Sequence, residues 1–335
     1  ILACLPGYDS FLNDIHGSFT WGSAWESKSF VFVGRRIRQQ DDFTLLIDQA
    51  SYVQEVPTTK VRLDPTTPLS TDPELITEFR SGVGSLQWLA GTTRGDIAAD
   101  TSLLQKPPKD LCVSDLQEVN GVLRYVRATA EATVKLVPIP FDQAMIVAYG
   151  DSGFANAPGG KSQGGFVITL TSKSALEQTS DASLLEWKSY RHQRVLRSTL
   201  AAEVCALDRA QDHGNFVAAM MSEMVDPNFQ AAYNERPLIE VVPVTDARSV
   251  WDAVHRLSTN FAEKRVEIDV AALRASCRNL RWVPTEIQMA DGMTKRSRAL
   301  RDAFRKWMAH PTITLVEARS PEDPYLPESA NQAWR

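Results

Sequence analysis

The spacing of apolar residues divides the chain into a β-rich start, a helical middle and a longer α/β part. Residues 30–38 and 43–47 are apolar-rich runs on either side of a polar turn, which predicts a β-hairpin. After a Pro/Thr-rich connector over 57–73, apolar residues recur at helical intervals in 74–104 and in 113–128. These last two segments are predicted to be helices that each bury one face.

From residue 135 onwards, short apolar runs are separated by turns and are then followed by helical patterns. Strands are predicted at 145–149, 165–170, 186–189, 238–245 and 280–283, the first three as an antiparallel meander. Helices are predicted at 198–224, 250–257 and 261–277. This order predicts a mixed sheet covered by helices. Pro243 is expected to mark a bulge or strand end, because proline donates no ladder hydrogen bond.

Composition predicts an ordered globular protein, with two domains favoured over one. The chain has 335 residues, 43% of them hydrophobic and 23% charged, which is enough for a substantial core. A formal net charge of −5 argues against a polycation but leaves room for a local basic track. The four cysteines are widely spaced, which favours a reducing intracellular compartment. No apolar stretch reaches the roughly 20 residues of a bilayer span, so no membrane partner is expected.

Four carboxylates stand in different local settings that a strand-strand-helix fold would gather into one metal-binding cluster. Asp151 and Asp246 end apolar runs, Glu203 borders the apolar stripe of a long helix, and Asp291 opens a last helix. Magnesium prefers such oxygen ligands, and clustering is expected to raise at least one pKa until a cation binds. Each acid also has a structural alternative: a strand-ending turn for Asp151, a partly exposed helix position for Glu203, and helix capping for Asp246 and Asp291.

The sequences around the four acids resemble, in order, the ribonuclease H region of copia-type retrotransposon polyproteins. The matching motifs are Tyr149-Gly150-Asp151 and the segments 197–203, 244–249 and 283–295. The resemblance implies an α/β fold, a ribonuclease H-like mixed five-stranded sheet in the order 3-2-1-4-5 with flanking helices. It also implies a metal-dependent endonuclease that hydrolyses the RNA strand of RNA/DNA hybrids with two Mg²⁺ ions, or with Mn²⁺ instead. Asp151 would bridge both ions, Glu203 and Asp246 would complete one site each, and Asp291 would complete the other ion's shell.

The resemblance extends upstream, to about residue 25. Segments 30–34, 83–90 and 93–97 are similar to parts of a reverse transcriptase beyond its polymerase site, including its thumb and connection helices. The Tyr-x-Asp-Asp motif of the polymerase is missing, because Asp41-Asp42 lacks the tyrosine, so DNA synthesis is not predicted. The expected domains are a smaller α+β thumb/connection-like region over 1–135, a ribonuclease H-like domain over 136–312 and a flexible tail over 313–335.

Basic and hydroxyl residues near the four acids are candidates for nucleic-acid binding. They are Ser152, Lys161, Arg197, Ser198, Arg248, Lys264, Arg265 and Lys295. Lysine and arginine would contact phosphates without regard to sequence, and serine would contact 2′-hydroxyls. For any single basic residue, an ordinary solvated charge is an equal alternative.

The partners that the resemblance implies are an RNA/DNA hybrid and the rest of the polyprotein, including the polymerase palm and fingers. The expected location is a cytoplasmic particle or the nucleus. Two other functions stay open on the sequence alone. One is a catalytically inactive element-derived protein that binds nucleic acid or another protein. The other is an integrase-like or exonuclease member of the same broad fold.

Overall fold

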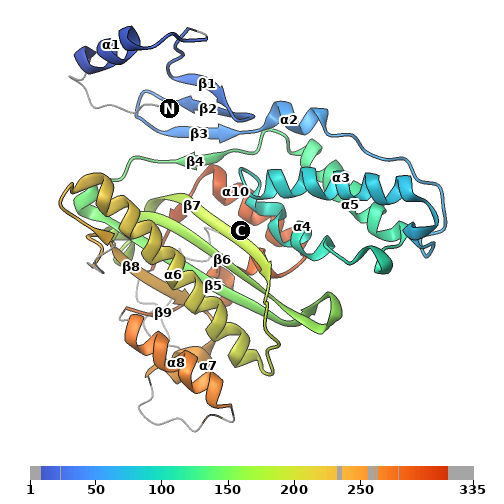
Figure 1. Ribbon diagram of the computed structural model, residues 1–335. Helices are drawn as coiled ribbons and strands as arrows, with labels where there is room; N and C mark the ends of the chain where they lie inside the picture. The colour runs from blue at the N-terminus through green and yellow to red at the C-terminus, as the bar shows by residue number, and fades with distance from the viewer. Residues whose placement is uncertain are drawn as a thin grey trace.

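The computed structural model describes residues 9–22, 24–231, 236–255, 261, 263–277 and 279–315. These residues form a mixed α/β structure with two sheets, ordered β1-β2-β3-β4 and β10-β7-β6-β5-β8-β9. Figure 1 shows a helical layer beside the small sheet and a long diagonal helix across the large sheet. None of the helices within the described ranges combines the length and apolar character that a bilayer span requires.

The small sheet is antiparallel throughout and follows the N-terminal helix α1 (Asp9–Ser18). Its strands are β1 (Ser29–Phe32), β2 (Arg35–Gln39), β3 (Leu45–Asp48) and β4 (Val134–Leu136). The predicted hairpin between 30–38 and 43–47 is confirmed by the antiparallel pairing of β2 with β3. The run over 30–38 itself contains two strands, β1 and β2. Val33 and Gly34 have φ values of 49° and 67°, and these positive values turn the chain back between β1 and β2.

The helical layer contains α2 (Ala50–Glu55), α3 (Pro73–Ala90), α4 (Ala98–Leu104) and α5 (Val113–Ala128). Its core includes Leu86 and Leu116, both inaccessible or nearly so to solvent. The predicted helix over 113–128 is confirmed. The predicted helical stretch over 74–104 is confirmed for α3 and α4 but is interrupted between them, because α3 ends at Ala90. The backbone N–H groups of Thr93 and Arg94 both donate to the Leu89 carbonyl, which closes the end of α3 before α4 begins.

The large sheet begins with the predicted antiparallel meander, which is confirmed. Its strands are β5 (Ala144–Ala157), β6 (Lys161–Ser172), β7 (Ser180–Arg191), β8 (Glu240–Thr245), β9 (Arg281–Trp282) and β10 (Thr312–Ile313). Strand β8 is parallel to β5 and to β9, and β10 adds a sixth strand beside β7 that the sequence did not predict.

Pro243 forms neither a bulge nor a strand end, contrary to the prediction. It pairs with Ala148 inside a regular parallel ladder between β5 and β8. On its other side β8 pairs with β9 only at Val244 and Thr245. Pro243 therefore has one neighbouring strand, and the missing N–H is tolerated as it is on an edge strand.

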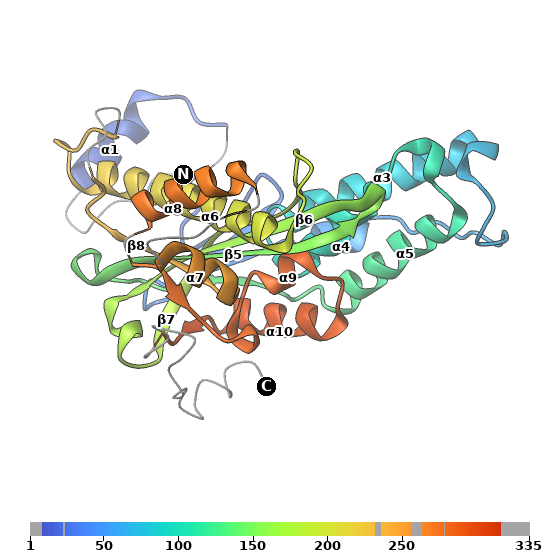
Figure 2. The same ribbon diagram turned by 90° about the horizontal axis from the view of Figure 1, so that it is seen from below.

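Helices cover both faces of the large sheet, as Figure 2 shows. They are α6 (Thr199–Val225), α7 (Arg248–His255), α8 (Lys264–Ser276), α9 (Asp291–Thr294) and α10 (Arg298–Ala309). Alternate residues of β5 belong to different cores: Ile146 and Ala148 pack on the α6 side, whereas Met145 and Val147 pack with α9 and α10. Because side chains alternate along a strand, this pattern predicts that Asp151 lies on the side of α9 and α10.

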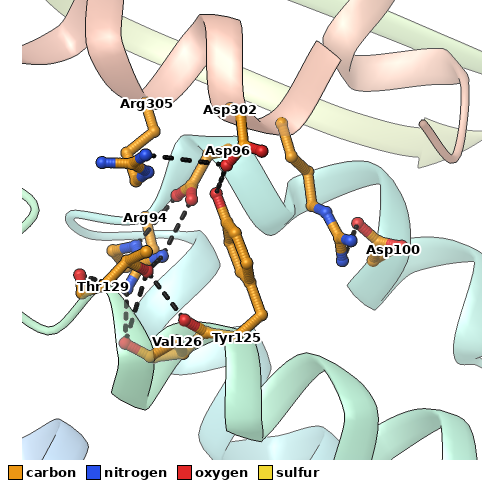
Figure 3. Close-up of polar contacts among 9 residues, drawn as sticks. Arg94, Asp96, Asp100, Tyr125, Val126, Thr129, Asp302 and Arg305 are labelled. Atoms are coloured by element: carbon orange, nitrogen blue, oxygen red, sulfur yellow. Dashed lines mark hydrogen bonds and ion pairs between the residues drawn. The ribbon is translucent and has the colours of Figure 1, made fainter. Parts of the chain in front are cut away.

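Polar contacts join the helical layer to α10, as Figure 3 shows. The Tyr125 hydroxyl donates to Asp302 at 3.2 Å, and Arg301 pairs with Asp100 at 3.4 Å. Beneath them Arg94 and Asp96 form a buried ion pair at 2.8 Å. The N-terminal helices and the C-terminal helix therefore share one polar junction. The predicted domain boundaries at 135 and 312 stay predictions.

The predicted tail over 313–335 stays a prediction, although its first residues belong to the core. Ile313 lies in β10, and both Ile313 and Leu315 are buried in the core on the α10 side of the sheet. The remainder of the predicted tail, from residue 316, lies outside the described residues.

Candidate acidic site

Asp151 lies inside a long strand, beyond the point where the neighbouring strand β8 ends. It pairs with Gly165 of β6, and β5 continues to Ala157, so the alternative of a strand-ending turn is wrong. On its other side, the ladder between β5 and β8 ends at the pair Tyr149–Val244. The carboxylate therefore lies next to the gap that β8 leaves.

Helix α9 brings Asp291 to Asp151 from one face of the sheet. The Thr294 hydroxyl, on the same helical turn as Asp291, donates to Asp151 Oδ2. Lys295 Nζ donates to Asp291 Oδ1 at 2.6 Å. The helix cap is Ala290, not Asp291, so the capping alternative for Asp291 is wrong.

The close approach of α9 depends on a glycine in β6. A Cβ atom added to Gly165 would lie 2.3 Å from the Cβ of Met293, which is closer than two carbon atoms can be without displacement. Gly165 is also the residue that pairs with Asp151. The same position therefore sets the distance between the strand carboxylate and the helix carboxylate.

Glu203 approaches from α6, which begins at Thr199 and is capped by the Ser198 side chain. Its side chain is buried, so the alternative of a partly exposed helix glutamate is wrong. The Ser152 N–H, beyond the end of the β5–β8 ladder, donates to Glu203 Oε2 at 3.2 Å. Glu203 therefore accepts a backbone hydrogen bond next to Asp151, beyond the point where pairing with β8 ends.

Asp246 directly follows β8 and is held by the segment before α9. The Thr285 hydroxyl donates to its Oδ2 at 2.8 Å, and Gln288 Nε2 lies 3.4 Å from its Oδ1. Gln288 Nε2 also donates to the Gly150 carbonyl at 3.1 Å. Gln288 thus ties the end of β8 to the strand that carries Asp151.

Electrostatics show that the acids lie within range of one another. Burial, followed by the charge of Asp291, raises the pKa of Asp151 to about 7. Burial, followed by the charges of Asp151 and Asp246, raises the pKa of Glu203 to about 9. Burial also raises the pKa of Asp291, against the lowering effect of Lys295. The expected increase in at least one pKa is confirmed, and its cause is burial before mutual repulsion.

The donor set suits a hard divalent cation, because all four groups are carboxylates and their negative charge is poorly compensated. Their arrangement is not a ready cage. Among the described residues, no group of three or more His, Cys, Asp and Glu side chains is placed to hold a metal ion. The carboxylate oxygens instead accept hydrogen bonds from the side chains of Thr294, Lys295 and Thr285. A metal would have to displace some of these partners.

The sequence-predicted nucleic-acid contacts are scattered. Ser152 is buried, and its hydroxyl lies 3.1 Å from both the Gln163 carbonyl and His192 Nε2. Ser198 caps α6, and Lys295 belongs to the acid cluster. The remaining candidates are all exposed: Lys161, Arg197, Arg248, Lys264 and Arg265.

Sequence reasoning missed Thr294 and His192. Thr294 had a usable signal, since it lies three residues after Asp291 and shares its helical face. His192 had none, because only the pairing of β5, β6 and β7 brings it to Ser152.

Comparison with known proteins gives limited likenesses. No family model matches the chain. A secreted RxLR effector protein of Plasmopara viticola is 27% identical over 133 residues, which is 39% of this chain and 85% of that protein. The N-terminal RNase H domain of Rv2228c from Mycobacterium tuberculosis, fused to maltose-binding protein, aligns with 49% of this chain and 97% of that chain at 15% identity and a TM-score of 0.29. RNase H1 from the archaeon Halobacterium salinarum aligns with 45% of this chain and 94% of its own at 16% identity and a TM-score of 0.30. Scores this low establish neither a common fold nor a function.

Proposed function

We propose that the acidic site is the centre of a metal-dependent endonuclease that hydrolyses the RNA strand of RNA/DNA hybrids. The observation that carries the proposal is that four carboxylates from four separate elements interact near the end of β8, where burial and the charges of neighbouring acids raise the pKa values of Asp151, Glu203 and Asp291. Burying several acids together without a bound cation is unfavourable, which makes a purely structural role a poor explanation.

The topology supports the same proposal. Numbered from β5, the neighbouring strands β7, β6, β5, β8 and β9 read 3-2-1-4-5, the order that the ribonuclease H resemblance implies. By the same resemblance, the chain is proposed to be part of a copia-type retrotransposon polyprotein, with the helical layer as its thumb and connection. The small sheet and the helical layer before β5 accord with a region of that kind.

Asp151, Glu203, Asp246 and Asp291 would hold the divalent ions. When bound, Mg²⁺ would lower the pKa of a coordinated water and stabilise the charge on the leaving oxygen. The chain's own part is to fix the carboxylates. Thr285 and Gln288 orient Asp246, while the Ser152 N–H orients Glu203. Lys295, next to Asp291, would then be free to contact a phosphate once metal replaces it.

Asp151→Asn tests the proposal, because it keeps the side-chain shape and removes a charge that acts on Glu203. Cleavage of an end-labelled RNA/DNA hybrid in Mg²⁺ is expected from the wild type, to stop in chelator, and to be lost in the variant. Asp142→Asn is the matched control, since Asp142 is exposed. Thermal denaturation with and without Ca²⁺ provides a second reading, and metal-induced stabilisation is expected for the wild type and the control alone.

Retained Mg²⁺-dependent cleavage by Asp151→Asn would remove the central assignment. Assays on duplex DNA and on single strands separate hybrid cleavage from the activity of an exonuclease-like or integrase-like relative. Cleavage of duplex DNA in preference to the hybrid would replace the proposed substrate.

A second candidate function is a protein that binds nucleic acid without cutting it. The observation that favours it is the occupation of the cluster by the Lys295 ammonium and the Thr294 hydroxyl, with no described group of acids placed to hold a metal. Wild-type protein that binds the hybrid but neither cleaves it nor gains stability from Ca²⁺ or Mn²⁺ would establish this alternative.

A further inference from the structure

A pocket of about 420 Å³ opens between the helical layer and the large sheet. One wall comes from the helical layer through Gln87 of α3 and through Ser102 and Gln105 in and after α4. The opposite wall comes from β6, β7 and α6. Its lining on that side is Lys161, Lys188, Ser189, Tyr190, Arg191, His192, Gln193 and Arg209.

The charge of this basic pocket is one-sided. Among the described residues that line it, four are lysine or arginine and none is aspartate or glutamate, although the whole chain carries a net charge of −5. Lys161 and Lys188 are exposed, so their ammonium groups are open to a ligand. A concentration of positive charge against the sign of the whole protein is the electrostatic footprint of an anion site.

Two arginines of the pocket are held in place by uncharged partners. The Arg209 guanidinium lies over the Tyr190 ring at 3.9 Å from its centre. Arg191 donates to the Gln105 carbonyl at 2.7 Å, while its Nε has no hydrogen-bond partner among the described residues. Neutral partners position a guanidinium without neutralising it. The planar guanidinium then keeps its charge for a bidentate contact to phosphate.

The pocket is connected to the acidic site through the sheet. His192 lines the pocket, and its Nε2 lies 3.1 Å from the hydroxyl of Ser152, the neighbour of Asp151. Burial and the charges of Arg194 and Arg209 lower the pKa of His192 to about 4, so the ring is neutral and adds no charge at neutral pH. Strands β5 and β7 are two strand spacings apart, roughly 10 Å.

We propose that the basic pocket binds backbone phosphates of the nucleic acid whose RNA strand lies at the acidic site, with the helical layer forming half of the binding surface. This inference rests on the proposed function and adds a subsite to it. It shifts the phosphate contacts away from Lys264 and Arg265, which the sequence suggested, to Lys188, Arg191 and Arg209. Backbone phosphate is the ligand of choice because the lining combines several cations with amide and hydroxyl donors.

Lys161→Gln/Lys188→Gln is the test variant, since both side chains are exposed and their loss leaves the fold intact. Fluorescence anisotropy of a labelled RNA/DNA hybrid, in chelator to prevent cleavage, gives the affinity at several salt concentrations. Binding is expected to weaken by roughly tenfold to a hundredfold, and the slope of log affinity against log salt is expected to fall by about two. Arg80→Gln/Lys109→Gln, at exposed positions outside the pocket, is the matched control and is expected to change binding less than threefold.

A second variant, Arg209→Gln, is compared with Arg209→Lys, which keeps the charge. Loss of binding with the first and partial recovery with the second are expected. Equal binding by the wild type and both pocket variants would overturn the proposal, and so would competition by an acidic peptide as effective as that by the hybrid. Failure of the proposed function looks different, because pocket-dependent binding would then persist without any cleavage in Mg²⁺.

Discussion

The acidic site and the basic pocket carry opposite charges on one sheet, and they differ most in burial. Asp151, Glu203 and Asp291 are buried, and burial is the main cause of their raised pKa values. Lys161 and Lys188 of the pocket are exposed. Buried charges alter stability and its dependence on pH, whereas solvated charges act mainly through salt-sensitive binding. The two sites should therefore respond to different perturbations.

The two sites also differ in which regions build them. The acidic site uses only the large sheet and its helices, but the pocket also needs α3 and α4. Disturbing the helical layer should therefore affect the pocket and leave the acidic site responsive to metal.

Arg94→Met should have the largest effect, because it leaves Asp96 buried without its cation. Both side chains of this ion pair are almost inaccessible to solvent. The free energy of unfolding is expected to fall by about 3–5 kcal/mol, measured by urea denaturation. Hybrid binding should weaken with it, while stabilisation of the sheet by Ca²⁺ persists. Arg80→Met, at an exposed position of α3, is the control. A loss below about 1 kcal/mol would show that water reaches Asp96.

The stability of the metal-free protein should fall as pH rises from about 4.5 to 9. The pKa of Asp151 is raised to about 7 and that of Glu203 to about 9, so the folded state binds more protons than the unfolded state in this range. Their stabilising effect is complete below the unfolded pKa values and is lost as pH rises through the folded ones. A loss of roughly 2–4 kcal/mol is expected in chemical denaturation at a series of pH values.

Glu203→Gln should flatten that pH profile, and Lys161→Gln/Lys188→Gln should leave it unchanged. A profile that keeps its slope in Glu203→Gln would mean that another group takes up the protons. A flat profile in the wild type would mean that the acids are better solvated than their burial indicates.

Lys295→Met should strengthen binding of Ca²⁺ or Mn²⁺ at the acidic site. The Lys295 ammonium donates to the Asp291 carboxylate and lies near the charges of Asp151 and Asp246. It therefore competes with a metal for these carboxylates. The dissociation constant measured by calorimetry is expected to fall about tenfold, or roughly 1.4 kcal/mol. Lys306→Met on α10, at an exposed position, is the control. Weaker metal binding would instead assign Lys295 to organising the carboxylates.

Thr285→Val should have the smallest effect. It removes the 2.8 Å hydrogen bond to Asp246 while keeping the side-chain shape. The free energy of unfolding is expected to fall by about 0.5–1.5 kcal/mol, which urea denaturation can resolve. Thr77→Val on α3 is a control, since that hydroxyl donates to its own helix backbone at Pro73. An increase in stability would indicate that Asp246 is better solvated when released.

The sequence predicted elements well where periodicity and burial agree. The helix over 113–128 and the antiparallel meander are confirmed, because one apolar face or alternate apolar residues identify each of them. The extension of β5 beyond Asp151 was not predictable in the same way. Ser152 and Gly153 are polar or small, and pairing with β6 rather than an apolar pattern of their own keeps them in the strand.

The sequence contexts pointed to the four acidic residues, but they did not predict which side chains donate hydrogen bonds to the carboxylates. Thr294 lies in α9 and Thr285 in the segment before it, and the position of α9 depends on the close approach permitted at Gly165. The basic pocket was also missed, apart from Lys161. Lys188 and Arg209 lie on different elements, and only the packing of α6 and the helical layer against β7 places them at one opening.

The junction between Tyr125 and Asp302 joins residues 177 positions apart. Such contacts raise contact order and slow folding, because a long chain segment must close before they form. During synthesis the helical layer leaves the ribosome long before α10. Its polar groups at this junction therefore lack their partners until α10 has been made. Folding intermediates that lack α10 should therefore expose Tyr125 and Asp100 to water, to chaperones and to proteases.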